Sequence, residues 1–519
     1  MGEEARPDGS APLDAVVDEV LAEAHVRPEE LRPEERAFLE QHALKKPLRV
    51  LDIWALGVGV VVAGAYFGWN LGLKDNGPVA MLLASLIVCL LYLTWVLALA
   101  ELSVAMPFAG GPLAYGRRAV NPLLGFVMGW SMFLECLFAA IGTALATGGY
   151  IAFLINPDKP DPVIQVVAGV ATVVIFFGLH AWGVKEQSRA MVFMTYGALA
   201  GLALFWVVAA SHFSWERVWP RDNLLRGKGW KAVLDAVPYA LWWLVMIETV
   251  ALSAEETHEP HRTLPRGLTW AQLTLIALVV LTWLFACGAV DSQDLAFTPG
   301  ADEEGKPTTQ AVDYPLAKAI RMIPAGQSRL LVYGFGAIAL FGLIASYHGM
   351  IYGASRQVFA LGRAGYLPRV LGEVHVTRRT PVVALLAGSL IVVGFVVANV
   401  WFADAVAVAV LVSTLTALIW YILAMACLYV LRRRSQELFR SYRAPVSLIL
   451  PAVVIVLSAF AVLVYSGIEH AGVVIALAAA LYAAGLGYYA LRGRHRLQAA
   501  APEELGARAA AAGPKEVCL

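Results

Sequence analysis

Apolar runs long enough to cross a lipid bilayer recur along most of this chain, starting at Trp54. A transmembrane helix needs about 20 mostly apolar residues, and a helix satisfies its own backbone hydrogen bonds in lipid. The runs therefore predict an all-α membrane protein with about twelve transmembrane helices. We place these helices at residues 54–73, 79–105, 122–153, 163–182, 190–212, 234–253, 268–290, 329–353, 381–400, 404–431, 446–466 and 471–491.

The composition agrees with a chain that lies mainly in lipid, since 59% of its residues are hydrophobic and 15% are charged. The 39 basic residues balance the 39 acidic ones, so net charge favours no nucleic-acid partner, and membrane lipid is the expected surrounding. The cysteines lack metal-ligand spacing, which favours packing residues or free thiols over a metal site. They are Cys89, Cys136, Cys287, Cys427 and Cys518.

Basic residues gather in alternate connections between the predicted helices, for example at Arg117 and Arg118, at Arg262 and Arg266, and across 432–443. By the positive-inside rule these connections are cytoplasmic, which predicts a multi-pass protein with both termini in the cytoplasm. The richness in Ala and Arg is typical of a GC-rich bacterial genome, so we expect a bacterial inner membrane. The loop at 214–231 dissents, because it is assigned outside yet is basic.

The parts outside the apolar runs contain little that predicts a further domain. The N-terminal tail, 1–50, has no cleavable signal sequence, and both it and the Ala-rich C-terminal tail, 497–519, are polar and of low complexity. We expect both tails to be cytoplasmic and to lack a folded domain. The longest external loop, 291–325, contains a stretch at Tyr314–Ile323 that is either a short amphipathic helix or a simple tether.

The first predicted helix is rich in small residues, with Ala63, Gly64 and Ala65 near its middle. Such a pattern indicates either close packing against another helix or a break in the helix. Unwound backbone is tolerated at this depth only where it is buried in protein or lines a cavity, where its N–H and C=O groups can bind a substrate or an ion.

Two carboxylates interrupt apolar runs without an intramembrane Lys or Arg to match them: Glu135 in the third run and Glu248 in the sixth. A charge at the membrane centre costs about 2.5–3.5 kcal/mol, so a compensating partner is expected. A cationic ligand or a proton would serve, and so would a hydrogen bond from a neighbouring helix. Glu101, near the end of the second run, is expected to pair with basic residues of a nearby loop.

Aromatic and polar side chains accompany these acids. Tyr239, Trp242 and Trp243 lie close to Glu248 in the sixth run, where they either enclose an ammonium group by cation–π contacts or face the lipid interface. In the eighth run, Ser346 and His348 are candidates to line the pathway, and His348 is either a proton carrier or a hydrogen-bonded packing residue.

Sequence features of an enzyme are weak. His258-Glu-Pro-His261 does not have the spacing of a zinc-binding helix, and Pro260 would interrupt such a helix. No nucleophile, metal cluster or phosphate-binding loop appears at a membrane face. We therefore expect neither catalysis nor a cofactor or metal.

Three motifs give the chain a resemblance to the amino acid, polyamine and organocation permeases, over essentially the whole membrane region. These are Leu56–Phe67, Ala100–Tyr115 and Ala254–Gly267. Within that superfamily the chain looks most like the ethanolamine permeases, on the strength of Tyr66–Leu73 and Ser346–Pro368.

The resemblance implies two inverted five-helix repeats within a transport core at 51–431, followed by two peripheral helices within 432–496. It places the break of the first helix at Ala63, Gly64 and Ala65, and that of the sixth at Met246, Ile247 and Glu248. The substrate site is then predicted to contain Ala63, Gly64, Ala65, Tyr66, Glu135, Tyr239, Trp242, Trp243, Met246, Ile247, Glu248 and Ser346.

Glycine is more usual in the family at Ala63, Ala65 and Met246, and these departures favour an amine without an α-carboxylate. We therefore expect alternating-access uptake of ethanolamine or a similar amine, coupled to a proton or sodium ion or driven by exchange. Glu135, Glu248 and His348 are the candidates for carrying a proton. The alternatives are an amino-acid permease of the same fold and a non-transporting membrane sensor.

Overall fold

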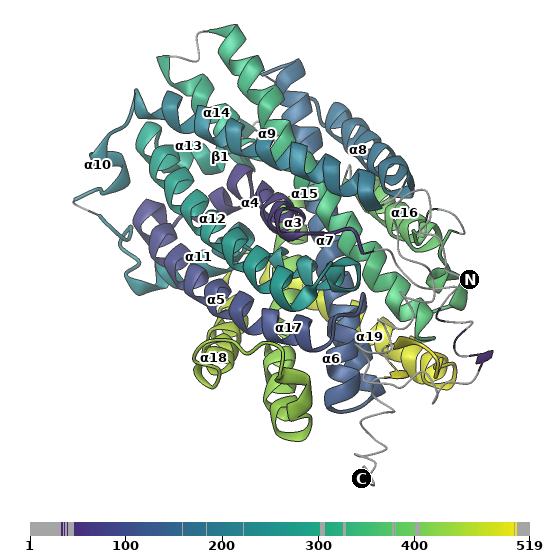
Figure 1. The fold of residues 1–519 in the computed structure, drawn as a ribbon. Coiled ribbons are helices and arrows are strands. Elements are labelled where there is room, and N and C mark those ends of the chain that lie inside the picture. Colours follow the sequence, from purple (N-terminus) through teal and green to yellow (C-terminus); the bar gives the residue numbers. More distant parts are fainter. Residues whose placement is uncertain are drawn as a thin grey trace.

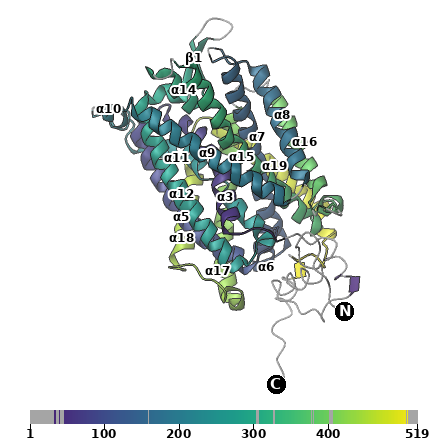
Figure 2. The ribbon, with the colours of Figure 1, turned by 45° about the horizontal axis from the view of Figure 1, so that its top comes forward.

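The computed structural model describes residues 46–505, apart from 158, 183, 222, 302–306, 325–327, 376–377, 379, 400–404 and 503, together with residues 33, 34, 36 and 39. Within this part the chain is a bundle of long helices that run up and down between two ends (Figures 1 and 2). We call them the hairpin end, where β1 and α14 lie, and the arginine end, where α6 lies (Figure 2).

The first and the sixth spanning segments are interrupted. The first five segments are α3 (Val50–Val61) with α4 (Ala63–Tyr66) and η2 (Trp69–Leu73), then α5 (Gly77–Ala105), α7 (Pro122–Ile155), α8 (Pro162–Trp182) and α9 (Val184–Ala210). The next five are α11 (Trp230–Ala240) with η3 (Leu241–Trp243) and η4 (Ile247–Glu256), then α12 (Pro260–Ala289), α15 (Arg329–Arg363), α16 (Val382–Ala398) and α17 (Ala405–Arg434). The last two are α18 (Ile449–Val464) and α19 (Ala471–Leu491).

These segments confirm the predicted all-α membrane fold. Among the described residues, 10 helices are long and apolar enough to span a membrane, and two shorter apolar helices lie at Val50–Tyr66 and Val382–Ala398. Together they coincide with the predicted runs to within several residues. The agreement follows from length and hydropathy, which are the properties that lipid imposes on a spanning segment.

Short elements connect the spanning segments at the two ends. They are α6 (Pro112–Ala119), α10 (Trp215–Val218), α13 (Ser292–Ala296), β1 (Phe297–Ala301), β2 (Pro307–Ala311), α14 (Pro315–Met322), η6 (Arg369–Gly372), η8 (Gln436–Phe439), η9 (Tyr465–Gly467) and η10 (Gly493–His495). The expected amphipathic helix in the long loop is α14. The antiparallel pairing of β1 and β2, which brings Phe297 opposite Ala311, was not predicted, because both segments contain proline, which is disfavoured in strands.

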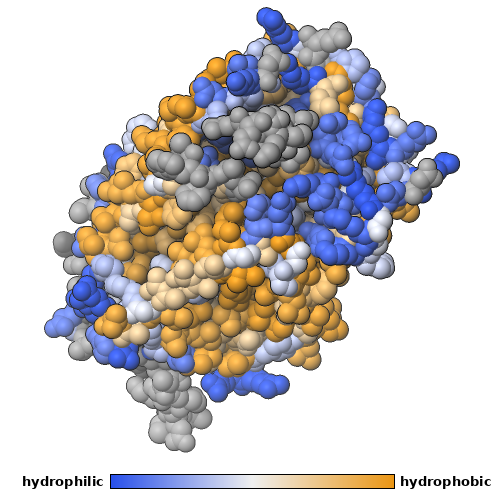
Figure 3. All heavy atoms as spheres, turned by 180° about the vertical axis from the view of Figure 1, so that it is seen from behind, coloured by the Kyte–Doolittle hydropathy of each residue, from blue (hydrophilic) through white to orange (hydrophobic). Residues whose placement is uncertain are grey.

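The outer surface of the bundle is apolar and its centre is enclosed. Figure 3 shows a broad hydrophobic face, with hydrophilic residues gathered mainly at its upper right and lower edge. Only 28% of the apolar window in Pro162–Trp182 and 17% of that in Ala471–His495 is buried, whereas the window in Trp230–Glu256 is 100% buried. The sixth spanning segment is therefore surrounded by protein, while α8 and α19 have large faces free for lipid.

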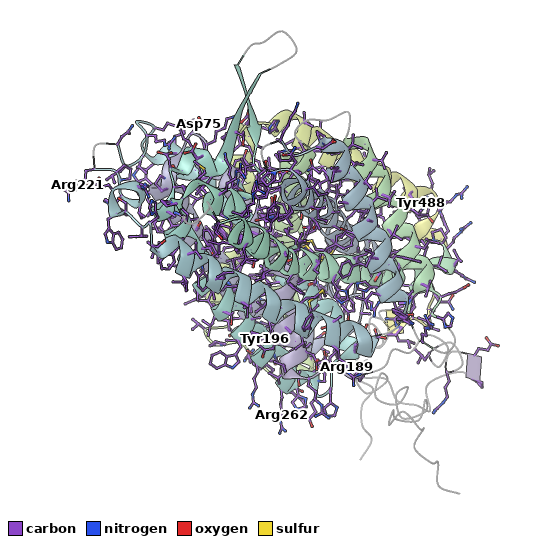
Figure 4. The ribbon with its side chains drawn as sticks, turned by 90° about the horizontal axis from the view of Figure 1, so that it is seen from above. Asp75, Arg189, Tyr196, Arg221, Arg262 and Tyr488 are labelled. Carbon is purple, nitrogen blue, oxygen red and sulfur yellow. The ribbon has the colours of Figure 1, made fainter. Side chains whose placement is uncertain are left out.

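The charged residues labelled in Figure 4 separate toward the two ends. Asp75 and Arg221 lie on the side of the β-hairpin, whereas Arg189 and Arg262 lie on the opposite side. The loop that dissented from the positive-inside pattern uses its cations structurally, because Arg217 donates from Nη1 to the carbonyl oxygens of Gly288 and Ala289 at 3.0 and 2.6 Å. Cations are favourable at such a helix C-terminus.

A buried ion pair ties α5 to α17 at the arginine end. The guanidinium of Arg432 donates to both carboxylate oxygens of Glu101 at 2.8 and 2.7 Å, and the Ala444 N–H donates to the same carboxylate at 2.8 Å. Glu101 is therefore a structural residue, as expected, and its main partner is the end of α17 rather than a loop.

The first part of the C-terminal tail packs on the arginine end. The Gln498 N–H donates to the Ala364 carbonyl at 2.9 Å, and the buried Glu504 accepts hydrogen bonds from Arg117 Nε and the Tyr366 hydroxyl, both at 2.8 Å. This contact was not predicted, because the apolar residues of the tail are mainly alanine.

Asp313, just before α14, predicts a pH dependence of stability. Partial burial raises its pKa from the ordinary 3.8 to about 6, and the hydrogen bond that Gln165 Nε2 donates at 3.1 Å offsets this in part. The acid form is thus favoured in the folded state, and its stabilising contribution is full below about pH 4 and lost as the pH rises through about 6.

We expect Asp313→Asn to remove this dependence. Compared with the wild type, the variant should unfold at nearly the same temperature at pH 4 and be more stable by about 1–2 kcal/mol at pH 8. Thermal unfolding of the detergent-solubilised protein across this pH range is the measurement. A difference that stays constant with pH would contradict the assignment.

Candidate functional site

The first spanning segment is interrupted by a side chain from α15. The Ser346 hydroxyl donates to the Gly59 carbonyl at 2.8 Å and accepts from the Ala63 N–H at 2.8 Å. Gly59 and Ala63 are four residues apart, so the hydroxyl occupies the place of a helical hydrogen bond, a known cause of kinks. The helix ends at Val61, and Ala63–Tyr66 form one further turn.

A second interruption follows that turn. Phe67 is extended and Gly68 has a φ of 89°, a left-handed value that glycine adopts without strain. The predicted break residues Ala63, Gly64 and Ala65 therefore lie in a short helical turn between two irregular points, rather than in the irregular backbone itself.

The sixth spanning segment is irregular from Leu244 to Met246, so of the three predicted break residues only Met246 lies in the break, and Ile247 and Glu248 begin η4. Helical structure is lost at Leu244 and resumes at Ile247, and between them Met246 has a φ of 84°. A side-chain-bearing residue is strained in this conformation, which explains why glycine is the more usual residue. The Glu248 carboxylate accepts a hydrogen bond from the Met246 N–H at 3.0 Å and so caps the start of η4.

The two broken segments touch at Gly64. A Cβ atom placed on Gly64 would lie 2.4 Å from the Trp242 carbonyl oxygen and 3.0 Å from that of Trp243. Both atoms belong to the backbone, so a neighbour cannot simply rotate away. Only glycine allows the turn at Ala63–Tyr66 to lie against the carbonyl groups of η3.

The centre of the candidate site is a pair of buried carboxyl groups. Glu135 of α7 and Glu248 of η4 both have no solvent-exposed surface, and two adjacent residues of α17, Trp420 and Tyr421, hold their carboxyl groups. Each keeps one oxygen, Glu135 Oε1 and Glu248 Oε2, without a protein donor. Within the described part of the chain, no Lys or Arg forms an ion pair with either group.

Aromatic residues from two further helices surround the pair. The Trp420 indole N–H donates to Glu135 Oε2 at 2.6 Å, and the Tyr421 hydroxyl donates to Glu248 Oε1. Trp95 stacks on Tyr421 with ring centroids 4.2 Å apart, and the hydroxyls of Tyr92 and Tyr421 are 3.2 Å apart.

The sequence did not identify these four aromatic residues as part of the site. They come from α5 and α17, and an aromatic residue in an apolar run is as easily explained by lipid contact. No sequence signal distinguishes an aromatic residue that faces the site from one that faces lipid.

The other aromatic residues predicted for the site lie toward the first spanning segment. Trp242 packs edge-on against Phe67 with centroids 5.3 Å apart, and Trp243 stacks on Trp69 at 4.5 Å. The indole nitrogens of Trp242 and Trp243 are buried and have no hydrogen-bond partner. The described aromatic contacts of the carboxyl pair are thus with Trp420 and Tyr421, and Trp242 and Trp243 line the adjoining break.

The remaining predicted residues are distributed around the two breaks. The Tyr66 hydroxyl donates to the Ala198 carbonyl at 2.6 Å, so it is directed toward α9. Tyr239 lies against Gly72, and Ile247 is buried beside the first segment. The ring of His348 packs against that of His180 of α8 with centroids 4.2 Å apart.

Buried ion pairs hold the arginine end of η4. Arg363 donates to both oxygens of Glu255 at 2.8 Å, and Arg356 donates from Nε to Glu256 at 2.6 Å. The backbone of Leu48 also pairs with this segment, through its N–H to the Glu256 carbonyl and its carbonyl to the His258 N–H. These contacts tie η4 to α15 and to the start of the first spanning segment at the arginine end.

The hairpin end is held by Asn70. Its side-chain amide donates to the carbonyl oxygens of Leu295 and Val312, both at 2.9 Å, and its Oδ1 accepts from the Gly68 N–H at 2.9 Å. Asn70 therefore joins the irregular part of the first segment to the long loop.

Comparison with known proteins agrees with this arrangement of two broken segments around a buried polar centre. The profile of the amino acid permease family matches residues 48–485. The chain belongs to the amino acid permease family. It is a multi-pass membrane transporter of the amino acid, polyamine and organocation type, which confirms the superfamily inferred from the three motifs.

Relatives of this transporter have different recorded functions. It is 29% identical to an uncharacterised transporter of Rhizobium meliloti (strain 1021), over 65% of this chain and 70% of that protein. It is 25% identical to a branched-chain amino acid permease of Bacillus subtilis (strain 168), over 82% and 89% of the two chains. A methylthioribose transporter of the same organism is 21% identical over 79% and 86%.

The contact at Gly64 predicts a sharp effect of a single methyl group. In Gly64→Ala, the new Cβ would force the two broken segments apart, and overpacking of this kind costs about 1–3 kcal/mol. We expect transport to fall by about tenfold or more. Gly178→Ala on α8 is the matched control, since a Cβ there meets no atom within 4 Å. Equal transport by both variants, measured in proteoliposomes, would contradict the close approach.

Proposed function

We propose that the transporter carries a small organic amine without an α-carboxylate, with ethanolamine as the leading candidate, by alternating access. The observation that carries the proposal is the Glu135–Glu248 pair, two fully buried carboxyl groups that lack a cationic partner among the described residues. An ammonium group supplies the missing charge and can donate hydrogen bonds to both free oxygens.

The aromatic surroundings suit such a ligand. Trp420 and Tyr421 each occupy one oxygen of the pair and orient it, while Trp95 and Tyr92 pack behind them. An ammonium group is attracted to aromatic faces as well as to carboxylates. The unpartnered indole N–H groups of Trp242 and Trp243 are donors that can serve the hydroxyl oxygen of an amino alcohol.

The first break favours a ligand without an α-carboxylate. An α-carboxylate would need free backbone N–H groups there. The Ala63 N–H is bonded to Ser346, the Gly68 N–H to Asn70, and the N–H groups of Ala65 and Phe67 to preceding carbonyls. These donors are therefore already used.

Alternating access would proceed by releasing the two ends in turn. Asn70 and its loop contacts would separate to admit the amine from the hairpin end, and the Glu255–Arg363 and Glu256–Arg356 pairs would separate to release it at the arginine end. We place the arginine end in the cytoplasm of a bacterium, by the distribution of basic residues. Uptake would then run from the hairpin end inward.

An amino acid is the alternative substrate. The Bacillus subtilis relative named as a branched-chain amino acid permease supports it, since that protein is similar over most of both chains. An amino acid would require the carboxylate to bind where Ser346 and Asn70 now bind, so the hydroxyl of Ser346 would have to move.

Uptake of radiolabelled ethanolamine into proteoliposomes tests the proposal. We expect saturable uptake by the wild type and at least about a tenfold loss in Glu135→Gln and in Glu248→Gln, because each removes a buried charge next to the ammonium. Asp235→Asn, at the surface of α11, is the control that should retain uptake. Transport of leucine that ethanolamine does not inhibit would exclude the amine as substrate and support the amino acid.

A further inference from the structure

Two buried carboxyl groups without a cationic partner require compensation. Glu135 and Glu248 have no exposed surface, and each keeps one oxygen without a hydrogen-bond donor. Adjacent residues of α17, Trp420 and Tyr421, hold the two groups in the same buried centre, and neither group has a Lys or Arg ion-pair partner within the described residues. Two bare negative charges in such a site would repel, whereas a cation or a proton on one of them removes this cost.

We infer that the Glu135–Glu248 pair is a site for one monovalent cation, held as a proton in the absence of substrate and as the substrate's ammonium group during transport. The inference rests on the proposed amine substrate. Binding is then a one-for-one exchange, in which the ammonium group binds between the two carboxyl groups and the proton is released. The pair with its bound cation has a net charge of −1 in both states.

The surroundings of the pair support a single-cation site. Each carboxyl group has one oxygen occupied by a neutral donor, Trp420 or Tyr421, which leaves one oxygen on each for the cation. The titratable groups that interact with the pair, directly or through Tyr92, are a thiol and phenols, which are neutral at ordinary pH. They are Cys136 on α7, Tyr92 on α5, Tyr421 on α17, Tyr465 at η9 and Tyr482 on α19.

The other candidate for proton transfer has a described partner of its own. His348 packs against His180, whose Nε2 lies 2.9 Å from the His348 carbonyl oxygen. The proposed exchange uses the two glutamates, and we expect a substitution of His348 to affect packing between α8 and α15 rather than the proton count.

Calorimetric titration of the purified transporter with ethanolamine, in buffers of different ionisation enthalpy, tests the exchange. We expect about one proton released per amine bound, and an affinity that rises about tenfold per pH unit while the pair is still protonated. Glu135→Gln and Glu248→Gln should each abolish the release. Asp235→Asn should release the same amount as the wild type. Binding without proton release would overturn the inference and leave the amine proposal intact.

Infrared spectroscopy of the substrate-free protein provides a test that does not depend on the substrate. A buried, protonated carboxyl group gives its own C=O stretching band, and we expect such a band at neutral pH in the wild type and in Asp235→Asn. It should be lost or shifted in both Glu→Gln variants. A wild-type spectrum without a contribution from the pair would overturn the inference, whereas a failure to bind ethanolamine alone would count against the amine.

Discussion

The burial of two carboxyl groups without a cationic partner among the described residues is the constraint on which the centre of this transporter depends. Glu135 and Glu248 have no exposed surface, and a buried carboxylate is tolerated only when a charge or hydrogen bonds compensate it. Trp420, Tyr421 and the Met246 N–H provide part of that compensation. One oxygen of each carboxyl group remains without a hydrogen-bond donor. We propose that a mobile cation binds these oxygens and is released from them during transport.

The break in the sixth segment positions Glu248 in this buried centre. Glu248 reaches its position because η4 begins directly after Met246, which has a left-handed backbone conformation. The Glu248 carboxylate accepts a hydrogen bond from the Met246 N–H. On the other side, the Ser346 hydroxyl replaces a helical hydrogen bond between Gly59 and Ala63. Irregular backbone at this depth is thus satisfied by side chains from neighbouring elements, as burial in lipid requires.

Sequence alone predicted the spans well and the site in part. Hydropathy located the spanning segments because lipid acts on every residue of a run, and Glu135 and Glu248 stood out as isolated charges. Their placement in one buried centre was not predictable, since it depends on how α17 brings Trp420 and Tyr421 to the two carboxyl groups. The roles of Trp420 and Tyr421 could not be read for the same reason, and the insertion of Ser346 into another helix leaves no local pattern.

The position of a bound amine tests the central claim most directly. A cryo-electron microscopy structure of the transporter with ethanolamine should show the ammonium group between Glu135 and Glu248, within hydrogen-bonding distance of both carboxyl groups. A ligand bound instead to the backbone at Ala63 and Gly64, with its ammonium group away from both carboxyl groups, would contradict the claim that the carboxyl pair is the cation site.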